Sequence, residues 1–478
     1  MKKILFVGAE AMPFAATGGL GDVLGSLPAA LAREGADVRV IIPLYGQVKE
    51  EWRKKMKTEA IFTVNLAWRQ LYCGIKSLKK DGVIYYFVDN EYYFKRDALY
   101  GSFDDGERFA YFSMAVMEAL SHLDFYPDVL HAHDWQAALS VVYLKSLYRS
   151  RAGYGEIRSV FTIHNIEYQG QYNFGILGDV FGLDLSQYEL MDFGGCINLM
   201  KAAIVSADTV STVSPRYAQE ICTPAFGRGL DGILCQNRHK LCGILNGIDY
   251  KYYNPGQDTA IPVRYNWRTR GKKSENKLAL QKALVLPVRR DVPMLAVITR
   301  LVAHKGLDIM TEILGKLIGE SDIQLVVLGC GEKNFEHYFS ELARCFPDKV
   351  RVILKYDRDL AKQIYAACDI FLMPSRSEPC GLSQMIASRY GAIPVVRETG
   401  GLYDSIKPYF EEGERMHGNG FTFSGYSGAE LYERVGAALS LWQNEEKRDR
   451  LIGKIMRTDF SWAAAARDYL AMYDKINA

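Results

Sequence analysis

The sequence lacks a large net charge and a long apolar run, and each absence excludes a class of protein. Its 478 residues carry 58 Lys and Arg against 56 Asp and Glu, a formal net charge of +2. A chain this close to neutral is not built for non-specific binding to nucleic acid or to an anionic membrane surface. No apolar stretch approaches the ~18–20 residues of a membrane span. We therefore expect a cytoplasmic protein with no nucleic-acid and no membrane partner.

Paired-cysteine motifs and metal-ligand clusters are also missing. The nine cysteines form no Cys-x-x-Cys pair and their number is odd, so they predict neither a disulfide framework nor a zinc site. His131 and His133 end a predicted strand, where we expect them on opposite faces, with no third ligand in view. We predict no metal and no cofactor. The glycine-rich loop after the first predicted strand does not match the dinucleotide fingerprint Gly-x-Gly-x-x-Gly, which disfavours a dehydrogenase or an epimerase.

The first half of the chain alternates strand-like apolar runs with helical stretches, a pattern typical of a parallel α/β sheet. The run at residues 4–7 is too short for a signal peptide and Glu10 interrupts it, so we predict a first strand there. We expect a long helix over residues 107–120. The predicted strands of this half are 4–7, 38–42, 83–88, 129–131, 159–163, 208–213 and 241–245.

The pattern starts again at residue 294, which predicts a second α/β half. Between the halves we expect a domain crossover near 246–260, and a polar connection where residues 250–292 lose apolar periodicity. We expect helices at 306–317, 359–368 and 461–476, and strands at 294–298, 324–328, 350–354, 370–373 and 393–396. Open parallel sheets bind ligands outside the carboxyl ends of their strands. The sequence therefore predicts a site in the cleft between two such sheets.

Four groups of residues follow predicted strands and carry the chemistry. Glycines in Gly18-Gly19-Leu20-Gly21-Asp22 would let backbone amides approach a phosphate or a sugar. Arg300 and Lys305 would offset the charge of a diphosphate. Glu378, in Glu378-Pro379-Cys380-Gly381, would accept bonds from sugar hydroxyls, and His164 beside Asn165 would donate one. Each of these groups, taken alone, also has a purely structural explanation. In the same order, these are a tight turn, a solvated basic loop, a carboxylate favoured by a helix dipole and a structural histidine.

Taken together and in this order, these segments closely resemble the bacterial glycogen synthase and plant starch synthase family. The likeness spans nearly the whole chain. It is carried by the stretches 13–22, 131–135, 164–165, 246–249, 300–306, 378–382, 399–402 and 418–421.

The resemblance implies a GT-B enzyme: an α/β fold of two Rossmann-like parallel-sheet domains facing a central cleft. The implied parts are an N-terminal acceptor and catalytic domain (1–245), a C-terminal nucleotide-sugar-binding domain (246–460), and a last helix (461–478) that crosses back to the N-terminal domain. It also implies transfer of glucose from ADP-glucose to the non-reducing 4-hydroxyl of an α-1,4-glucan such as glycogen, with retention and without a metal.

Roles carry over by matching motif. The resemblance implies Arg300 and Lys305 on the donor diphosphate, Glu378 at the glucose, and His164 at its 6-hydroxyl side. Tyr356 matches a residue that stacks on the adenine. The remaining positions implied to line the donor and acceptor sites are Thr17, Gly18, Gly19, Asp22, Asp134, Asn165, Asn246, Cys380, Gly381, Leu382, Thr399, Gly400 and Gly401.

One position departs from the family pattern. The usual motif is Lys-Thr-Gly-Gly-Leu, and Ala16 stands here in place of the Lys. The local positive charge is then left to Arg300 and Lys305, so we expect weaker donor binding than in relatives. Two alternatives stay open: a related transferase that uses UDP-glucose or a small acceptor, and a weakly active glucan-binding homologue.

Overall fold

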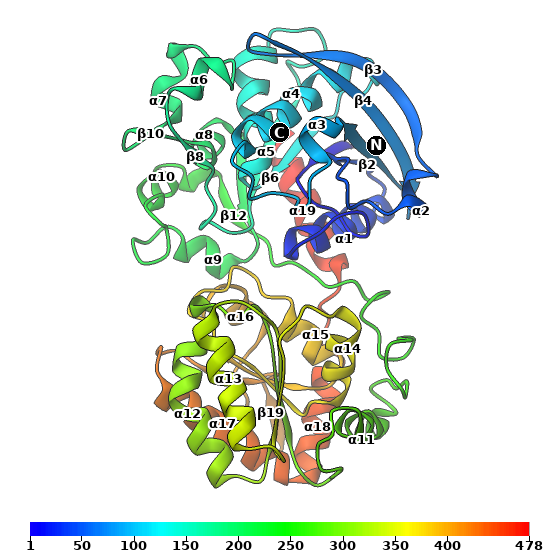
Figure 1. Cartoon of the computed structure of the whole chain (residues 1–478), viewed down its shortest axis with the longest axis vertical. Helices are drawn as coiled ribbons and strands as arrows, with labels where there is room; N and C mark the ends of the chain where they lie inside the picture. The colour runs from blue at the N-terminus through cyan, green and yellow to red at the C-terminus, as the bar shows by residue number, and fades with distance from the viewer. Residues whose placement is uncertain (478) are drawn as a thin grey trace. The chain divides into compact units, whose positions relative to one another are not determined.

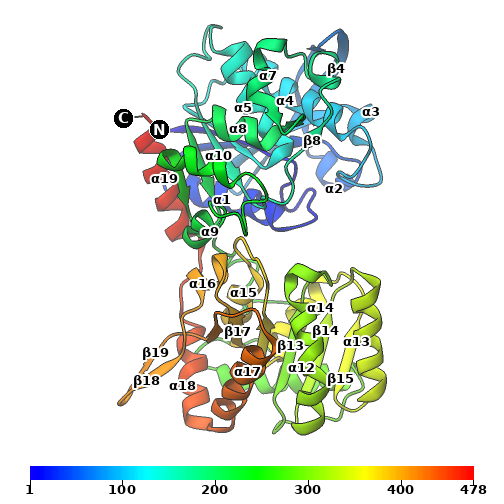
Figure 2. The same cartoon turned by 90° about the vertical axis from the view of Figure 1, so that its left-hand side faces the viewer.

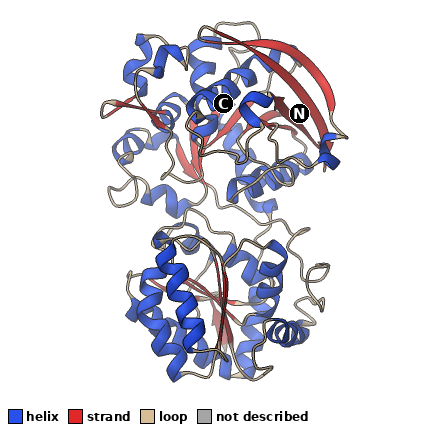
Figure 3. Cartoon of the chain, viewed as in Figure 1, coloured by secondary structure: helices blue, strands red, loops and turns tan. Residues whose placement is uncertain are grey.

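The computed structural model describes residues 1–477, which divide into two compact units. Unit 1 contains residues 1–247 together with the C-terminal segment from Trp462, and unit 2 contains Ile248–Ser461. Each unit has its own sheet covered by helices (Figures 1 and 3). Such layering buries both faces of a parallel sheet, which explains why most of the parallel strands are rich in apolar residues.

The large sheet of unit 1 has nine strands, of which seven run parallel and two form an antiparallel hairpin at one edge. In spatial order they are β12 (Leu241–Gly243), β11 (Thr209–Thr212), β7 (Arg158–Ile163), β6 (Val129–His133), β1 (Lys3–Val7), β2 (Asp37–Pro43), β5 (Val83–Asp89), β4 (Arg69–Lys80) and β3 (Lys57–Leu66). The parallel strands follow the doubly wound order, in which the chain moves outward from β1 on one side and then from β6 on the other.

The main helices of unit 1 cover this sheet. They are α1 (Gly19–Arg33), α2 (Glu50–Arg53), α3 (Glu91–Phe94), α4 (Asp105–His122), α5 (Trp135–Tyr143), α8 (Leu199–Ser206), α9 (Pro215–Glu220) and α10 (Asp231–Gln236). A small antiparallel sheet of β8 (Gln171–Tyr172), β10 (Cys196–Asn198) and β9 (Asp192–Phe193) lies with α6 (Ile176–Asp179) and α7 (Tyr188–Met191) outside the main sheet.

The last helix, α19 (Trp462–Asn477), belongs to unit 1. It packs against α1 (Figures 1 and 2). Its Tyr473 hydroxyl lies 2.7 Å from His131 Nδ1, and both side chains are fully buried. The helix α19 is therefore an integral part of the fold of unit 1.

Unit 2 is built on six strands that all run parallel. Their spatial order is β15 (Val350–Ile353), β14 (Gln324–Leu328), β13 (Met294–Ile298), β16 (Ile370–Met373), β17 (Ile393–Arg397) and β20 (Phe421–Phe423). This is again the doubly wound order, with its switch between β13 and β16.

Helices lie on both faces of this sheet (Figure 2). They are α11 (Lys273–Ala283), α12 (Leu307–Glu320), α13 (Lys333–Cys345), α14 (Arg358–Ala367), α15 (Ser383–Arg389), α16 (Gly400–Ser405), α17 (Gly428–Gln443) and α18 (Glu445–Ile455), and a hairpin of β18 (Phe410–Glu412) and β19 (Arg415–His417) precedes β20. Leu314, Leu325 and Ile393, all fully buried, are among the side chains of its apolar core.

One expectation about the elements needs correction. The connection at 250–292 is not wholly irregular, because it contains α11, whose Lys273 and Lys277 are buried and donate to carbonyl groups of Tyr365, Ala366 and Val292. Buried lysines break the apolar pattern and hide this helix from a periodicity argument.

Among residues 1–477, no helix combines the length and the apolar character needed to span a bilayer.

Candidate active site

The predicted site residues gather at the carboxyl edge of each sheet, around its switch point. In unit 2, Arg300 and Lys305 follow β13 and Glu378 follows its neighbour β16. In unit 1, the glycine loop follows β1 and Asp134 follows its neighbour β6, with His164 after β7. Two strands that diverge at a switch point leave a crevice between their following loops. Strand order thus brings together, within each unit, residues that lie far apart in sequence.

The group of predicted residues in unit 2 centres on an ion pair between a half-buried lysine and a buried glutamate. Lys305 Nζ lies 2.7 Å and 2.9 Å from the two carboxylate oxygens of Glu378, and Ser375 Oγ donates to the same carboxylate at 2.9 Å. Glu378 is 6% exposed. Two residues predicted separately to act on the donor therefore bind each other in this structure. Sequence reasoning missed Ser375, which lies in the same loop after β16.

Arg300 and Tyr356 lie nearer to solvent. Arg300 is exposed, and within residues 1–477 its guanidinium has no hydrogen-bond or ion-pair partner. A guanidinium offers five N–H donors in a planar fork that matches phosphate oxygens. Tyr356, in the loop between β15 and α14, is 77% exposed.

The loops after β16 and β17 meet closely. A Cβ on Gly400, whose φ is +44°, would lie 2.0 Å from the carbonyl oxygen of Glu378, so only glycine fits at this position. The Gly401 amide donates to the same carbonyl at 3.1 Å. This contact places Thr399, Gly400 and Gly401 against the loop that carries Glu378, Cys380, Gly381 and Leu382. The structure thus brings the predicted residues of these two loops together.

In unit 1, a buried carboxylate that sequence reasoning missed holds the glycine loop. Glu10 is 1% exposed and accepts hydrogen bonds from Thr17 N (2.6 Å), Thr17 Oγ1 (2.7 Å) and Gly18 N (3.3 Å), and also from the Tyr100 hydroxyl. Tyr100 contacts the Thr17 hydroxyl as well. Hydrogen bonds from these hydroxyl and amide groups to the Glu10 carboxylate therefore hold the glycine loop in place. An acidic residue at the end of β1 was the signal in the sequence.

The segment that carries Tyr100 is itself anchored by a fully buried arginine. Arg108, on α4, donates to the Tyr93 carbonyl at 2.7 Å and the Leu99 carbonyl at 3.0 Å, and pairs with Asp105. A buried charge is stable only when it is paired and its donors are used. Arg108 thus supports the position of the tyrosine that bonds Glu10.

His131 and His133, which are buried in β6, form a cluster with the half-buried His164 after β7, and here one expectation was wrong. The rings of His131 and His133 lie 4.1 Å apart on the same face of β6, because residues two apart in a strand point the same way. His133 Nδ1 lies 2.9 Å from His164 Nε2, and His131 Nε2 lies 2.5 Å from Thr162 Oγ1. Burial lowers the pKa of His164 to about 3, and it holds the pKa values of His131 and His133 well below their ordinary range. All three imidazoles are therefore neutral near neutral pH.

Asp134 adopts a strained backbone conformation beside this cluster. Its φ of 57° and ψ of 178° fall in a region that is essentially restricted to glycine. Its Oδ1 accepts from the His164 amide at 2.7 Å. Burial raises the pKa of the Asp134 carboxyl to about 7, and the nearby charge of Glu10 adds to that rise. Strain of this kind persists only where the surroundings impose it, and it is commonly found at functional positions.

We expect Asp134→Gly to be more stable than Asp134→Ala by about 1–3 kcal/mol, since both lose the carboxylate but only glycine relieves the strain. Urea unfolding of the two variants measures the difference. The same pair of changes at Asp359, an exposed position in α14, should give the reverse order by about 1 kcal/mol. Equal stabilities for the two Asp134 variants would show that the backbone is not strained.

The remaining predicted residues of unit 1 lie nearby along the same edge. Asp22 is in the first turn of α1. Asn165 Oδ1 accepts from the Glu167 amide at 3.0 Å and so shapes its own turn. Asn246, after β12, is 5% exposed, and its Oδ1 is buried without a hydrogen-bond partner among the described residues. An unused buried acceptor is costly, which marks Asn246 as a position where a ligand donor would be favourable.

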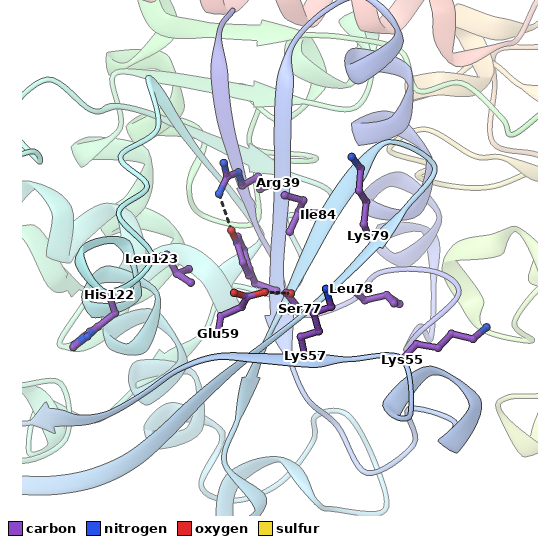
Figure 4. Close-up of a pocket in the computed structure, with 11 residues that line it drawn as sticks. Arg39, Lys55, Lys57, Glu59, Ser77, Leu78, Lys79, Ile84, His122 and Leu123 are labelled. Carbon is purple, nitrogen blue, oxygen red and sulfur yellow. Dashed lines mark hydrogen bonds between the residues drawn. The ribbon is translucent and has the colours of Figure 1, made fainter.

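A hollow of about 450 Å³ in unit 1 lies elsewhere (Figure 4). Its lining residues Arg39 and Ile84 are at the amino ends of β2 and β5, the edge of the sheet opposite to the glycine loop. Arg39 donates to the Tyr86 hydroxyl at 2.7 Å and the Ser77 hydroxyl donates to Glu59, while the ammonium groups of Lys55 and Lys79 point apart (Figure 4). It is not part of the candidate site. Across residues 1–477, no group of three or more His, Cys, Asp and Glu is arranged to hold a metal ion.

Comparison with known proteins first defines the class of protein. A family model described as "Starch synthase catalytic domain" matches residues 3–236, and one described as "Glycosyl transferases group 1" matches residues 285–455. The chain superposes on a sucrose-phosphate synthase from Thermosynechococcus elongatus with a TM-score of 0.61 at 16% identity, a likeness of fold alone. These matches confirm the predicted fold class, the α/β GT-B class with two parallel-sheet domains, and the protein is a hexosyltransferase.

Closer relatives then define the family. A glycogen synthase of Geobacillus thermodenitrificans is 47% identical over 476 residues, which are 99% of this chain and 98% of the relative, and one of Bacillus subtilis is 46% identical over the same shares. The catalytic domain of Starch Synthase IV from Arabidopsis thaliana, bound to ADP and acarbose, matches with a TM-score of 0.92 at 35% identity over 100% of this chain and 99% of that one. The chain belongs to the glycogen synthase and starch synthase family.

Proposed function

We propose that this chain elongates an α-1,4-glucan such as glycogen by transferring glucose from ADP-glucose, with retention of anomeric configuration, in the cytoplasm. The observation that carries the proposal is the buried Lys305–Glu378 pair at the switch point of unit 2. ADP is bound by the Starch Synthase IV relative. Membership of the glycogen synthase family supports a glucan as the acceptor.

Unit 2 would hold the donor. Arg300, with its donors unused, and Lys305 would bind the diphosphate, and the amides around Thr399, Gly400 and Gly401 lie on the loop beside them. The Tyr356 ring would stack on the adenine. Glu378 would exchange part of its bond with Lys305 for hydroxyls of the glucose, and the amides of Cys380, Gly381 and Leu382 lie in the same loop. Binding of the diphosphate thus replaces one negatively charged partner of Lys305 by another.

Unit 1 would orient the sugar and the acceptor. The neutral His133–His164 pair can be arranged with His133 Nδ1–H donating to His164 Nε2, which leaves His164 Nδ1–H to donate to a sugar hydroxyl. Asp134, Asn246 and Asp22 would accept from further hydroxyls. Thr17, Gly18, Gly19 and Asn165 lie in the loops beside them.

The chemical step needs no protein nucleophile. The bond between the anomeric carbon and the phosphate oxygen breaks while the acceptor 4-oxygen bonds to the same face of that carbon, and the acceptor proton passes to the departing phosphate. The products are ADP and a glucan longer by one glucose. Negative charge grows on the leaving phosphate as the bond stretches, so Arg300 and Lys305 bind the transition state more tightly than the ground state.

Incorporation of labelled glucose into glycogen from ADP-glucose and from UDP-glucose, both in the presence of a chelator, tests the proposal. We expect incorporation from ADP-glucose that the chelator does not reduce. Preference for UDP-glucose would support the first alternative stated above, and glucan binding without incorporation the second. Strict dependence on a divalent ion would contradict the mechanism.

We expect Ala16→Lys to lower the KM for ADP-glucose by about tenfold, because it adds one charged hydrogen bond to the donor. A Cβ on Gly21 would lie 2.3 Å from Ala16 Cβ and 3.2 Å from Glu10 Oε2, so the side chain of residue 16 starts beside the carboxylate that holds the glycine loop. Steady-state kinetics measures the change, and Ala16→Met controls for length without charge. An unchanged donor KM in Ala16→Lys would remove position 16 from the donor site.

A further inference from the structure

A second hollow lies in unit 2, away from the candidate active site, and its lining is strongly basic. Its volume is about 600 Å³, and it is lined by the β18–β19 hairpin, the second half of α18 and the segment around Trp267. Figure 2 shows the hairpin projecting beside α18. The hairpin leads into the amino end of β20, whereas Lys305 and Glu378 follow the carboxyl ends of strands in the same parallel sheet. The hollow is therefore built by elements that the proposed reaction does not use.

Helix α18 contributes a row of cations. Arg450, Lys454 and Arg457 are spaced at i, i+4 and i+7 along and just beyond this helix, so they share one face. Like charges at i and i+4 destabilise a helix when nothing offsets them. Arg270 and Arg415 add two more cations from other elements, so that five converge on the hollow from three parts of the chain.

The acidic side chains around the hollow are too few to neutralise these five cations. Glu414 is the acidic side chain in the lining, and Asp449, outside the lining, is held by Arg270 with Nε–Oδ1 at 2.7 Å. Across residues 1–477, the side chain of Arg415 has no hydrogen-bond or ion-pair partner. The hollow therefore keeps an excess of positive charge.

Several of these cations are already held in place, but through main-chain oxygens. Arg450 donates to the Glu414 carbonyl and Lys454 to the Met416 carbonyl, both at 2.8 Å. The Arg457 guanidinium lies 5.1 Å from the centre of the Trp267 ring. Carbonyl bonds fix the direction of a cation without neutralising it, and an arginine so held keeps spare N–H donors. A preorganised set of donors with uncompensated charge is what an anion site requires.

We propose that this hollow binds a small phosphate-bearing anion. Arg415 would close on it from the hairpin, opposite the cations of α18. Arginine is the side chain best suited to phosphate oxygens, because its planar fork binds two of them at once.

Isothermal titration with inorganic pyrophosphate at fixed ionic strength tests the site. Because Lys305 is expected to bind a diphosphate too, the titration uses the full-length Lys305→Ala protein. We expect one saturable site in that protein. Adding Arg415→Gln should weaken binding by about tenfold or more, the effect of losing one charged hydrogen bond.

Arg467→Gln is the matched control. Arg467 is exposed on α19 in unit 1 and loses the same charge when changed, so affinity should stay unchanged. Lys454→Gln should weaken binding as Arg415→Gln does. Absence of saturable binding to the Lys305→Ala protein, or equal affinities in the Arg415→Gln and Arg467→Gln proteins, would overturn the proposal. Neither result depends on which sugar nucleotide the enzyme uses.

Discussion

Lys305→Ala should lose about 10²–10³-fold in kcat, the effect of removing one preorganised donor from a developing negative charge. The reason is the position of Lys305 at the switch point, 2.7 Å from a carboxylate whose place a phosphate oxygen can take. Steady-state incorporation of labelled glucose measures the loss. Lys305→Arg should recover part of the activity, since it restores the charge with a different shape. Lys316→Ala, an exposed lysine on α12, should leave kcat unchanged.

The same substitution should also destabilise unit 2, because it leaves Glu378 buried without its counter-ion. Removing one partner of a buried pair costs about 3–5 kcal/mol. Adding Glu378→Gln to Lys305→Ala should return most of that stability without returning activity. Thermal unfolding and turnover therefore separate the two roles. If Lys305→Ala kept full turnover, the lysine would be structural only.

Unit 1 should lose stability in mild acid. Burial lowers the folded pKa values of His131, His133 and His164, while unfolded histidine titrates near 6.5. Below about pH 6.5 the unfolded chain therefore binds three protons that the folded protein does not bind. The free energy of unfolding then decreases as the pH falls, by about 1.4 kcal/mol per pH unit for each histidine. Asp134 acts in the opposite sense: its raised pKa of about 7 favours the fold as pH falls from 7 towards 4. Three lowered histidine pKa values outweigh one raised carboxyl pKa, so the net stability falls as the pH falls below about 6.

Urea unfolding followed by circular dichroism at about pH 7, 6 and 5 measures this slope. His164→Gln should reduce this slope by about 1.4 kcal/mol per pH unit, because the unfolded variant binds one proton fewer. His337→Gln, at an exposed position in α13, should leave it unchanged. A stability that does not change between pH 6.5 and 5 would mean that the three imidazoles accept protons in the folded state.

The sequence predicted the parts of the site better than their contacts. Arg300, Lys305 and Glu378 were each predicted from their place after a strand, and the fold class is confirmed. The Lys305–Glu378 bond was not predictable, because it depends on β13 and β16 being neighbours although 73 positions separate the two residues. Periodicity identifies strands but does not order them in a sheet.

The residues that were missed are those whose role is visible only through a partner. Glu10 served only to end an apolar run in the sequence, and Tyr100 lies in a loop without periodicity, yet together they fix the glycine loop. His131 and His133 were placed on opposite faces, although a two-residue spacing in a strand puts them on one. The two-stranded β3–β4 edge was not foreseen either, since its half-buried strands carry polar side chains on one face.

A crystal structure of the chain with ADP bound would test the central claim most directly. We predict that the diphosphate lies within hydrogen-bond distance of the Arg300 guanidinium and the Lys305 ammonium, with the Lys305–Glu378 bond lengthened or broken. A nucleotide bound away from these two side chains, with the ion pair intact, would contradict the account.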